Sequence, residues 1–409
     1  MLRRARAATM LLAASATGAC GAGSATGPAR EHHTLRVPGQ YATIQAAVRA
    51  SHPGDLVLIA RGTYRESVAV DDEHGRIVLR GVDRNRVVLD GDDRLADGIA
   101  VHADGVAVEN LTVRRFQVNG VVWSPSGEYG DDRQLQGWRG SYITAYDNGL
   151  YGVYAFGAEH GRFDHIYASG QPDSGVYVGR CRPCHALVRD STGEHNHVGY
   201  EATNASGDVT VVGNVWRRNR VGVEINALRK EAGFPQSGSL LSRNIITNNN
   251  ERAAPRGSEG FGAGVVINGG SDDVVRDNRV TGHVTAGIVI LDSPDATATD
   301  NVVRGNRLRG NATDLALQTA SRTSQGTCFV ANRGDSGGLR TAPEDLQRQT
   351  AGACGRSVRV GAGRLHHAAA PPQVDYRTVP APPPQPTMPE AGVAPARPAT
   401  GRPEDEAGA

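Results

Sequence analysis

A short motif, a glycine followed by alternating apolar residues, recurs through the middle of this 409-residue chain. The clearest copies begin at Gly98, Gly120, Gly152, Gly175, Gly199, Gly222, Gly264 and Gly287. Most neighbouring copies are 22 to 24 residues apart, and two longer steps of 32 and 42 residues contain insertions. A unit of this length cannot bury its apolar face alone, whereas stacked copies share one continuous core. The repeat therefore predicts a solenoid.

The pattern inside each unit indicates which solenoid this is. Short runs of Val and Ile alternate with Gly, Asn and Asp, which is typical of strands joined by tight turns. The chain contains 52 glycines and few aromatic residues, and long helical periodicity is rare. We therefore predict an all-β, right-handed parallel β-helix of about ten coils of roughly 23 residues.

An asparagine recurs at a turn inside the coil. We align four of these residues in one column, in which stacked amides hydrogen-bond along the solenoid and satisfy buried turn backbone. They are Asn214, Asn244, Asn278 and Asn301. His165 and Asp190 fall at or next to the same column, so we interpret this whole column as scaffold.

The two ends of the repeat differ from its middle. Ile44, Ala47 and Val48 recur at helical spacing after Thr43, which predicts a short capped helix covering the open N-terminal end. From about Pro371 the chain is rich in Pro and Ala without periodicity. We expect a signal peptide over 1–19, a lipid-anchored linker over 20–36, the β-helix over 37–366 and a disordered tail over 367–409.

The first twenty residues indicate export. Arg3, Arg4 and Arg6 precede a short apolar run, and Thr17-Gly18-Ala19-Cys20 is similar to the lipobox of bacterial lipoproteins. We predict that Cys20 carries a lipid that tethers the chain to the outer face of the cell membrane. An ordinary secretory signal cleaved nearby is the alternative.

The other four cysteines suit an oxidising compartment. We expect two disulfides, Cys181–Cys184 and Cys328–Cys354. A zinc site at Cys181 and Cys184 with nearby histidines is the alternative.

Several segments resemble the pectate-lyase-like β-helix superfamily. They are the entry segments 43–48, 53–57 and 61–66 and the Gly/Asn repeats. The coil with Gly175-Val176-Tyr177-Val178 and Cys181-x-x-Cys184 resembles exported β-helix repeat proteins of high-GC bacteria. The resemblance covers about residues 37–320. It implies the fold but no particular activity, because the superfamily contains lyases, hydrolases, esterases, epimerases and non-catalytic members.

Alignment of the repeats predicts which side chains share the outer face of one sheet. The residue two after each opening glycine forms a first outward column: Ala100, Val122, Tyr154, Tyr177, Glu201, Glu224, Val266 and Val289. A second column contains His102, Ser124, Phe156, Gly179, Thr203, Asn226, Asn268 and Leu291. Aromatic rings stack on sugars, and carboxylates and amides bind hydroxyls. We therefore expect a polysaccharide to contact Tyr154, Phe156, Tyr177, Thr203, Asn226 and Asn268.

Two stacked carboxylates, Glu201 and Glu224, are the first candidate catalytic groups. Because like charges on neighbouring strands repel, a shared proton, an arginine or a Ca²⁺ ion has to relieve the pair. Their short separation matches retaining glycosidases better than inverting ones. A pair of solvated glutamates without function is the alternative.

Histidines supply further candidates. His195 and His197 follow Glu194, and we expect them to line one edge of the same face as general bases. Exposed turn residues without a catalytic role are the alternative. Insertions at 124–139, 227–238 and 250–260 are expected to wall a groove.

We predict that the chain is a monomeric, membrane-tethered protein that binds a polysaccharide. Cleavage or epimerisation of that polysaccharide is a candidate further activity. A formal net charge of +1 indicates no nucleic-acid partner. The rival hypothesis is a non-catalytic structural or adhesion β-helix of the cell envelope.

Overall fold

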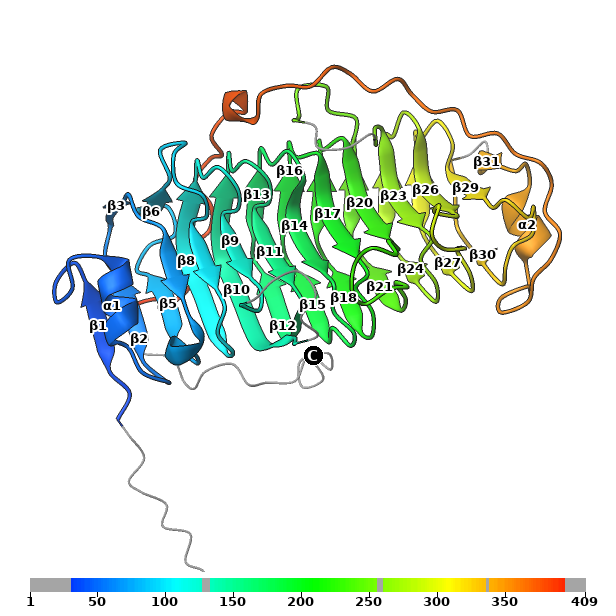
Figure 1. The fold of residues 1–409 in the computed structure, drawn as a ribbon. Helices are drawn as coiled ribbons and strands as arrows, with labels where there is room; N and C mark the ends of the chain where they lie inside the picture. Colours follow the sequence, from blue (N-terminus) through cyan, green and yellow to red (C-terminus); the bar gives the residue numbers. More distant parts are fainter. Residues whose placement is uncertain (1–30, 127–132, 256–259, 336–337, 394–409) are drawn as a thin grey trace, which may run out of the picture. The chain divides into compact units, whose positions relative to one another are not determined.

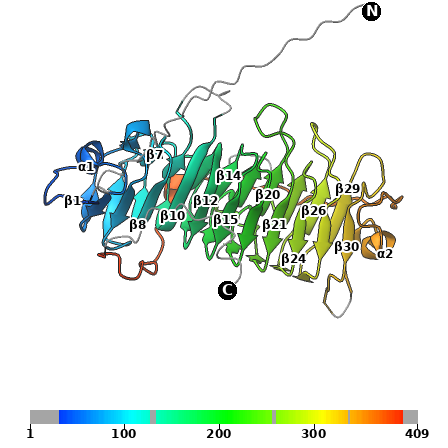
Figure 2. The same cartoon turned by 90° about the horizontal axis from the view of Figure 1, so that it is seen from below.

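The computed structural model describes residues 31–126, 133–255, 260–335 and 338–393. Residues 32–393 contain parallel strands that stack coil upon coil between a helix at each end (Figures 1 and 2). The predicted right-handed parallel β-helix is confirmed, with eleven stacked strands in one described sheet where about ten coils were expected. Residues 1–30, which include the expected signal and Cys20, lie outside the described residues.

The eleven-stranded sheet, here called sheet B, contains one short strand from each coil. Its strands are β4 (Val68–Val70), β7 (Ile99–Val101), β9 (Val121–Trp123), β11 (Val153–Phe156), β14 (Ser174–Gly179), β17 (Val198–Thr203), β20 (Val221–Asn226), β23 (Ala263–Asn268), β26 (Ala286–Leu291), β29 (Leu315–Gln318) and β31 (Thr341–Ala342). Their inward side chains, such as Val176 and Val223, are fully buried, because alternate residues of a strand point to opposite faces.

The twenty-stranded sheet, sheet A, forms the rest of each coil. Its strands are β1 (Thr34–Val37), β2 (Leu56–Ile59), β3 (Gly62–Tyr64), β5 (Val78–Gly81), β6 (Val87–Asp90), β8 (Val106–Arg114), β10 (Leu135–Tyr146), β12 (Ala158–Asp164), β13 (Tyr167–Ser169), β15 (Ala186–Arg189), β16 (Thr192–Glu194), β18 (Val209–Val212), β19 (Val215–Arg217), β21 (Ser239–Ser242), β22 (Ile245–Thr247), β24 (Val274–Arg276), β25 (Arg279–Thr281), β27 (Val302–Arg304), β28 (Arg307–Arg309) and β30 (Cys328–Val330). The first predicted insertion is shorter than expected, since β10 already begins at Leu135.

Helices cover both ends of the stack. The predicted cap is α1 (Ile44–Ala50), where the Thr43 hydroxyl accepts a hydrogen bond from the Ala46 amide at 3.1 Å. At the other end α2 (Leu346–Thr350) packs beside β30. Two short 3₁₀ turns, η1 (Asp72–His74) and η2 (Tyr376–Thr378), complete the helical segments that the structure describes.

The asparagine column is present, with one correction. Asn214, Asn244 and Asn278 form a ladder in which each side-chain amide donates to the next at 3.0 Å, but the next member is Asn306. Asn301 instead accepts from the backbone of Asp273, at a different corner. The assignment of Asn301 was therefore wrong. The inward amide of Asn306 makes the same bonds five residues further along the coil.

Residues 367–393, the described part of the tail that composition predicts to be disordered, make contacts with the solenoid. Figure 1 shows this segment running from α2 back along the solenoid. Arg220, which is fully buried, donates to the carbonyls of Pro371 and Pro372 at 3.0 and 2.8 Å. Arg84 donates to the carbonyl of Pro386 at 3.1 Å. A proline-rich segment lacks amide donors, so its ordering depends on such donors from the solenoid.

Candidate functional site

The first outward column of sheet B has the predicted register. Adjacent strands pair Ala100 with Val122, Val122 with Tyr154, and Tyr154 with Tyr177. The column continues through Glu201, Glu224, Val266 and Val289. Parallel strands place such residues about 4.8 Å apart, so their side chains are direct neighbours. The two glutamates therefore do lie on adjacent strands.

A cavity of about 480 Å³ lies over the N-terminal half of this face. Its floor comes from the outward columns of β7, β9 and β11, including Tyr154 and Phe156. Residues on two sides supply its walls: Ser126, Arg133 and Gln134 on one side, and Arg180 and Arg182 with Ala232 and Gly233 of the 227–238 insertion on the other. Two insertions thus wall a groove, as expected from the sequence.

Two stacked aromatic side chains form part of this floor, and a third packs against them. The rings of Tyr154 and Phe156 are stacked with centroids 5.2 Å apart, and the Arg180 guanidinium lies 5.0 Å from the Phe156 ring centroid. Tyr151 stacks on Tyr154 at 4.3 Å. Alignment of the repeats missed Tyr151, because it precedes the strand and lies outside both outward columns.

Tyr177 occupies a different position from the one its column suggests. Its ring is 3 % exposed, with Tyr154 4.7 Å away, and it lies over Gly179. A Cβ on Gly179 would lie 2.3 Å from the Tyr177 hydroxyl, so the glycine makes room for the ring. Tyr177 thus supports Tyr154 from below and presents no open face for a sugar.

An acidic cluster continues the same face beyond Tyr177. Burial, the charge of Asp173 and a hydrogen bond to Asp173 raise the pKa of Glu201 well above its usual range, and the charges of Glu224 and Glu231 add to this. Burial also raises the pKa of Glu224 to about 7, although a hydrogen bond from Asn226 opposes the shift. Both carboxyls of the pair are therefore shifted toward their protonated forms, Glu201 the more strongly.

The polar residues of the second column mainly bind one another. The Thr203 hydroxyl donates to Glu201 at 3.4 Å, and Asn268 donates to the Asn226 side chain at 3.2 Å. Thr203 and Asn226 are buried, at 3 % and 7 % exposure. They therefore orient the acidic cluster rather than form an open row of sugar ligands.

The two predicted histidines lie on the turn between β16 and β17. His195 follows β16 at a corner, where the charged groups around it are Glu194, Arg217, Arg218 and Glu251, and burial lowers its pKa. His195 therefore has the charged groups of sheet A as its neighbours. His197 is buried, with 1 % of its surface exposed, and its role as a general base stays a prediction.

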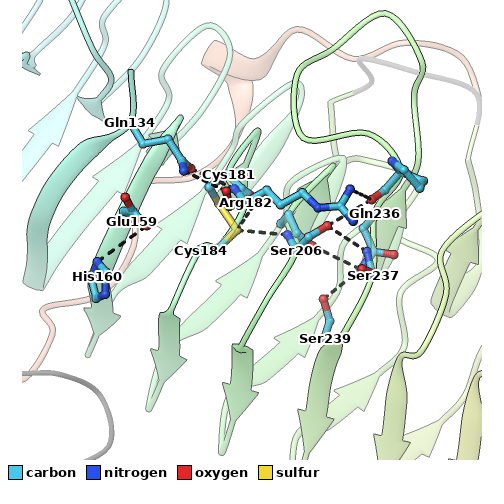
Figure 3. Close-up of a disulfide and its surroundings, with 12 residues drawn as sticks. Gln134, Glu159, His160, Cys181, Arg182, Cys184, Ser206, Gln236, Ser237 and Ser239 are labelled. Carbon is cyan, nitrogen blue, oxygen red and sulfur yellow. Dashed lines mark hydrogen bonds and ion pairs between the residues drawn. A yellow bond between two sulfur atoms is a disulfide. The ribbon is translucent and has the colours of Figure 1, made fainter. Parts of the chain in front are cut away.

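The Cys181–Cys184 disulfide, shown in Figure 3, closes a small ring around Arg182, and Arg182 lines the cavity. Arg182, inside this small ring, exchanges hydrogen bonds with Gln134: its amide donates at 2.9 Å and its carbonyl accepts at 3.1 Å. Its guanidinium donates to the carbonyls of Phe234 and Pro235. The disulfide thereby connects both walls. Cys328 and Cys354 form the second predicted disulfide, so the zinc alternative lacks its thiolates.

Several solved structures have a similar fold. The A-module of the mannuronan C-5 epimerase AlgE4 of Azotobacter vinelandii has a TM-score of 0.45 and 14 % identity, covering 73 % of this chain and 94 % of its own. A mannuronic-acid-specific family 6 polysaccharide lyase from human gut microbiota has a TM-score of 0.48 and 13 % identity, covering 74 % and 86 %. Identities this low say nothing about activity. No curated protein sequence matches the chain.

A protein-family model described as NosD, periplasmic copper-binding protein, matches residues 109–324. Copper sites in proteins use converging imidazole, thiolate, thioether or carboxylate ligands. Within the described residues, no three His, Cys, Asp or Glu side chains converge in this way, and the four cysteines are in disulfides. The residues described here therefore do not form a copper site of that kind.

The family match covers most of the repeats. It extends from β8 to the turn before β30 and includes both outward columns of the cavity from Val122 onward. This span is more than half of the 409 residues. The chain belongs to the NosD family.

Proposed function

We propose that the protein binds a saccharide chain in the cavity on the outer face of sheet B. The observation that carries this proposal is the stacked pair Tyr154 and Phe156, which lines a walled cavity of about 480 Å³. Ring faces held by neighbours lose little entropy when a sugar stacks on them. Ser124, Asn119 and Gln134 line the same cavity and supply hydroxyl and amide groups for sugar hydroxyls.

The test is binding by a Tyr154→Ala, Phe156→Ala variant, measured by glycan array and affinity gel electrophoresis. We expect affinity to fall about tenfold or more, since each aromatic contact contributes about 0.5–1.5 kcal/mol beyond burial. Tyr142→Ala is the matched control, because its ring stacks on His165 at a corner away from the cavity. Equal affinities of the double variant and the wild type would remove the proposal.

A second candidate function, cleavage or epimerisation, rests on the acidic cluster. Burial and Asp173 raise the pKa of Glu201, and burial raises the pKa of Glu224 to about 7, which suits exchange of a proton with a bound substrate. An enzyme assay that reads new reducing ends and unsaturated uronate absorbance tests this. Glu201→Gln and Glu224→Gln should lose turnover but keep binding. Binding without product in the wild type would leave a non-catalytic envelope protein.

We further propose that the protein is exported and tethered by a lipid on Cys20. The arginine-rich start, the short apolar run and the cysteine that ends it support this, as does the periplasmic location in the family description. Within the described residues, no helix has the length and apolarity that crossing a membrane requires. A Cys20→Ala form should leave the detergent phase that the wild type enters. A wild type found wholly in the aqueous phase contradicts anchoring.

A further inference from the structure

Arginines stack in line on the outer side of sheet A at the C-terminal coils. Strand pairing sets Arg279 of β25 beside Arg307 of β28, and an isolated bridge sets Arg307 beside Arg333. Parallel pairing separates these neighbours by about 4.8 Å. Three positive charges therefore form a line parallel to the solenoid axis, a feature that a net charge of +1 conceals.

A second, shorter line lies across the adjacent corner. Arg276 of β24 pairs with Arg304 of β27. The chain bends between β24 and β25 at Asp277, whose φ of 57° is in the left-handed region. The two lines thus flank one corner of the solenoid. The ladder residues Asn278 and Asn306 lie at this corner, between the two lines.

Most of these arginines have no counter-charge. Arg279, Arg304, Arg307 and Arg333 are exposed, and their side chains make no hydrogen bond or ion pair with another described residue. Arg276 pairs with Asp277 at 3.2 Å, and Arg309 with Asp335 at 3.4 Å. This surface, hereafter the arginine corner, therefore has six guanidinium groups against two paired carboxylates.

Like charges on adjacent strands destabilise a sheet, and no ion pair with a described residue offsets the repulsion among Arg279, Arg307 and Arg333. An external anion with regularly spaced charges offsets it by placing a carboxylate or sulfate between neighbouring guanidinium groups. An anion with one charge can neutralise one pair of neighbouring arginines. A linear polyanion along the axis can neutralise each pair in turn. The geometry therefore favours a polymer over a small ion.

We propose that the arginine corner binds a linear acidic polysaccharide laid along the solenoid axis. A chain at the corner reaches both lines of arginines. A flat bilayer meets one line at a time, because the lines lie on opposite sides of a bend. This site is separate from the sheet B cavity and does not depend on saccharide binding there.

The test compares two triple variants of equal charge in the full chain. Arg279→Gln, Arg307→Gln, Arg333→Gln removes the longer line. Arg61→Gln, Arg86→Gln, Arg94→Gln removes three exposed arginines near the N-terminal coils, whose side chains are 62 %, 67 % and 83 % exposed. Binding to polygalacturonate and to heparin is measured by calorimetry over a range of salt concentrations.

We expect the first triple variant to bind about tenfold more weakly and to show a shallower salt dependence, because fewer counterions are released. The control triple should stay within about twofold. A Tyr154→Ala, Phe156→Ala variant should keep this binding, which separates the corner from the cavity.

Three outcomes overturn the proposal. Equal loss in both triple variants shows a net-charge effect alone, and no loss in the first shows that the corner is not used. Vesicles of phosphatidylglycerol and phosphatidylcholine that bind more tightly than either polymer, with the same loss in the first triple variant, assign the corner to a membrane surface. Unchanged thermal melts establish that the variants fold.

Discussion

Glu224 is expected to make the folded protein less stable above neutral pH than in mild acid. Its pKa is about 7 in the folded state against 4.5 in its ordinary state, chiefly through burial. The folded state therefore binds more protons between these values, so stability is complete below about pH 4.5 and declines as pH rises to about 7. The full shift corresponds to about 3 kcal/mol, and partial access of water reduces this to about 1–2 kcal/mol.

The assay is denaturant unfolding of the wild type and Glu224→Gln at pH 5 and pH 8. Glutamine resembles the neutral carboxyl. Between pH 5 and pH 8 the free energy of unfolding should therefore fall by about 1–2 kcal/mol less in the variant than in the wild type. The comparison has to be between proteins, because His283, with a pKa lowered to about 4 by burial, contributes in the opposite direction at pH 5.

Glu73→Gln is the matched control, because Glu73 is exposed on η1. It should retain the wild-type difference between the two pH values. If Glu224→Gln also retains that difference, the carboxyl ionises in contact with water, and the argument that burial raises its pKa fails.

Three further predictions follow from contacts at the site and its scaffold. Gly179→Ala should lower stability by about 1–3 kcal/mol and weaken glycan binding, since the new Cβ displaces the Tyr177 ring; chemical unfolding and affinity gels measure both. Asn278→Ala should cost about 1–3 kcal/mol, because the Asn244 amide and Leu241 carbonyl lose buried partners, whereas Asn85→Ala at the surface should have a smaller effect on melting. If calcium binds Glu201 and Glu224, it should raise the melting temperature of the wild type but not of Glu224→Gln; identical melts contradict a calcium site.

The sequence predicts a large part of the face because the coil has a regular length. A step of about 23 residues and a side-chain period of two set which residues stack, so both outward columns could be aligned without coordinates. The cysteine pairing and the capping helix were likewise predicted, from parity and from local spacing.

The sequence-based predictions fail where the regular spacing of the coils gives no guide. Asn301 and Asn306 both precede short apolar runs, and choosing between them requires the position of the corner within that coil. The proline-rich segment shows no periodicity, yet carbonyls from it meet buried arginines that lie more than 100 residues earlier in the chain.

By itself, the sequence determined the solenoid and the stacking order of its side chains, because both depend on local spacing that every coil repeats. The tertiary structure decided which of those side chains a ligand can reach. Tyr177 and Glu201 share a column with Tyr154, but neighbouring coils and an insertion decide that Tyr177 is covered and that the pKa of Glu201 is raised. Burial and the charges around a carboxyl depend on residues brought together across coils, and those distances are not encoded in the period of the repeat.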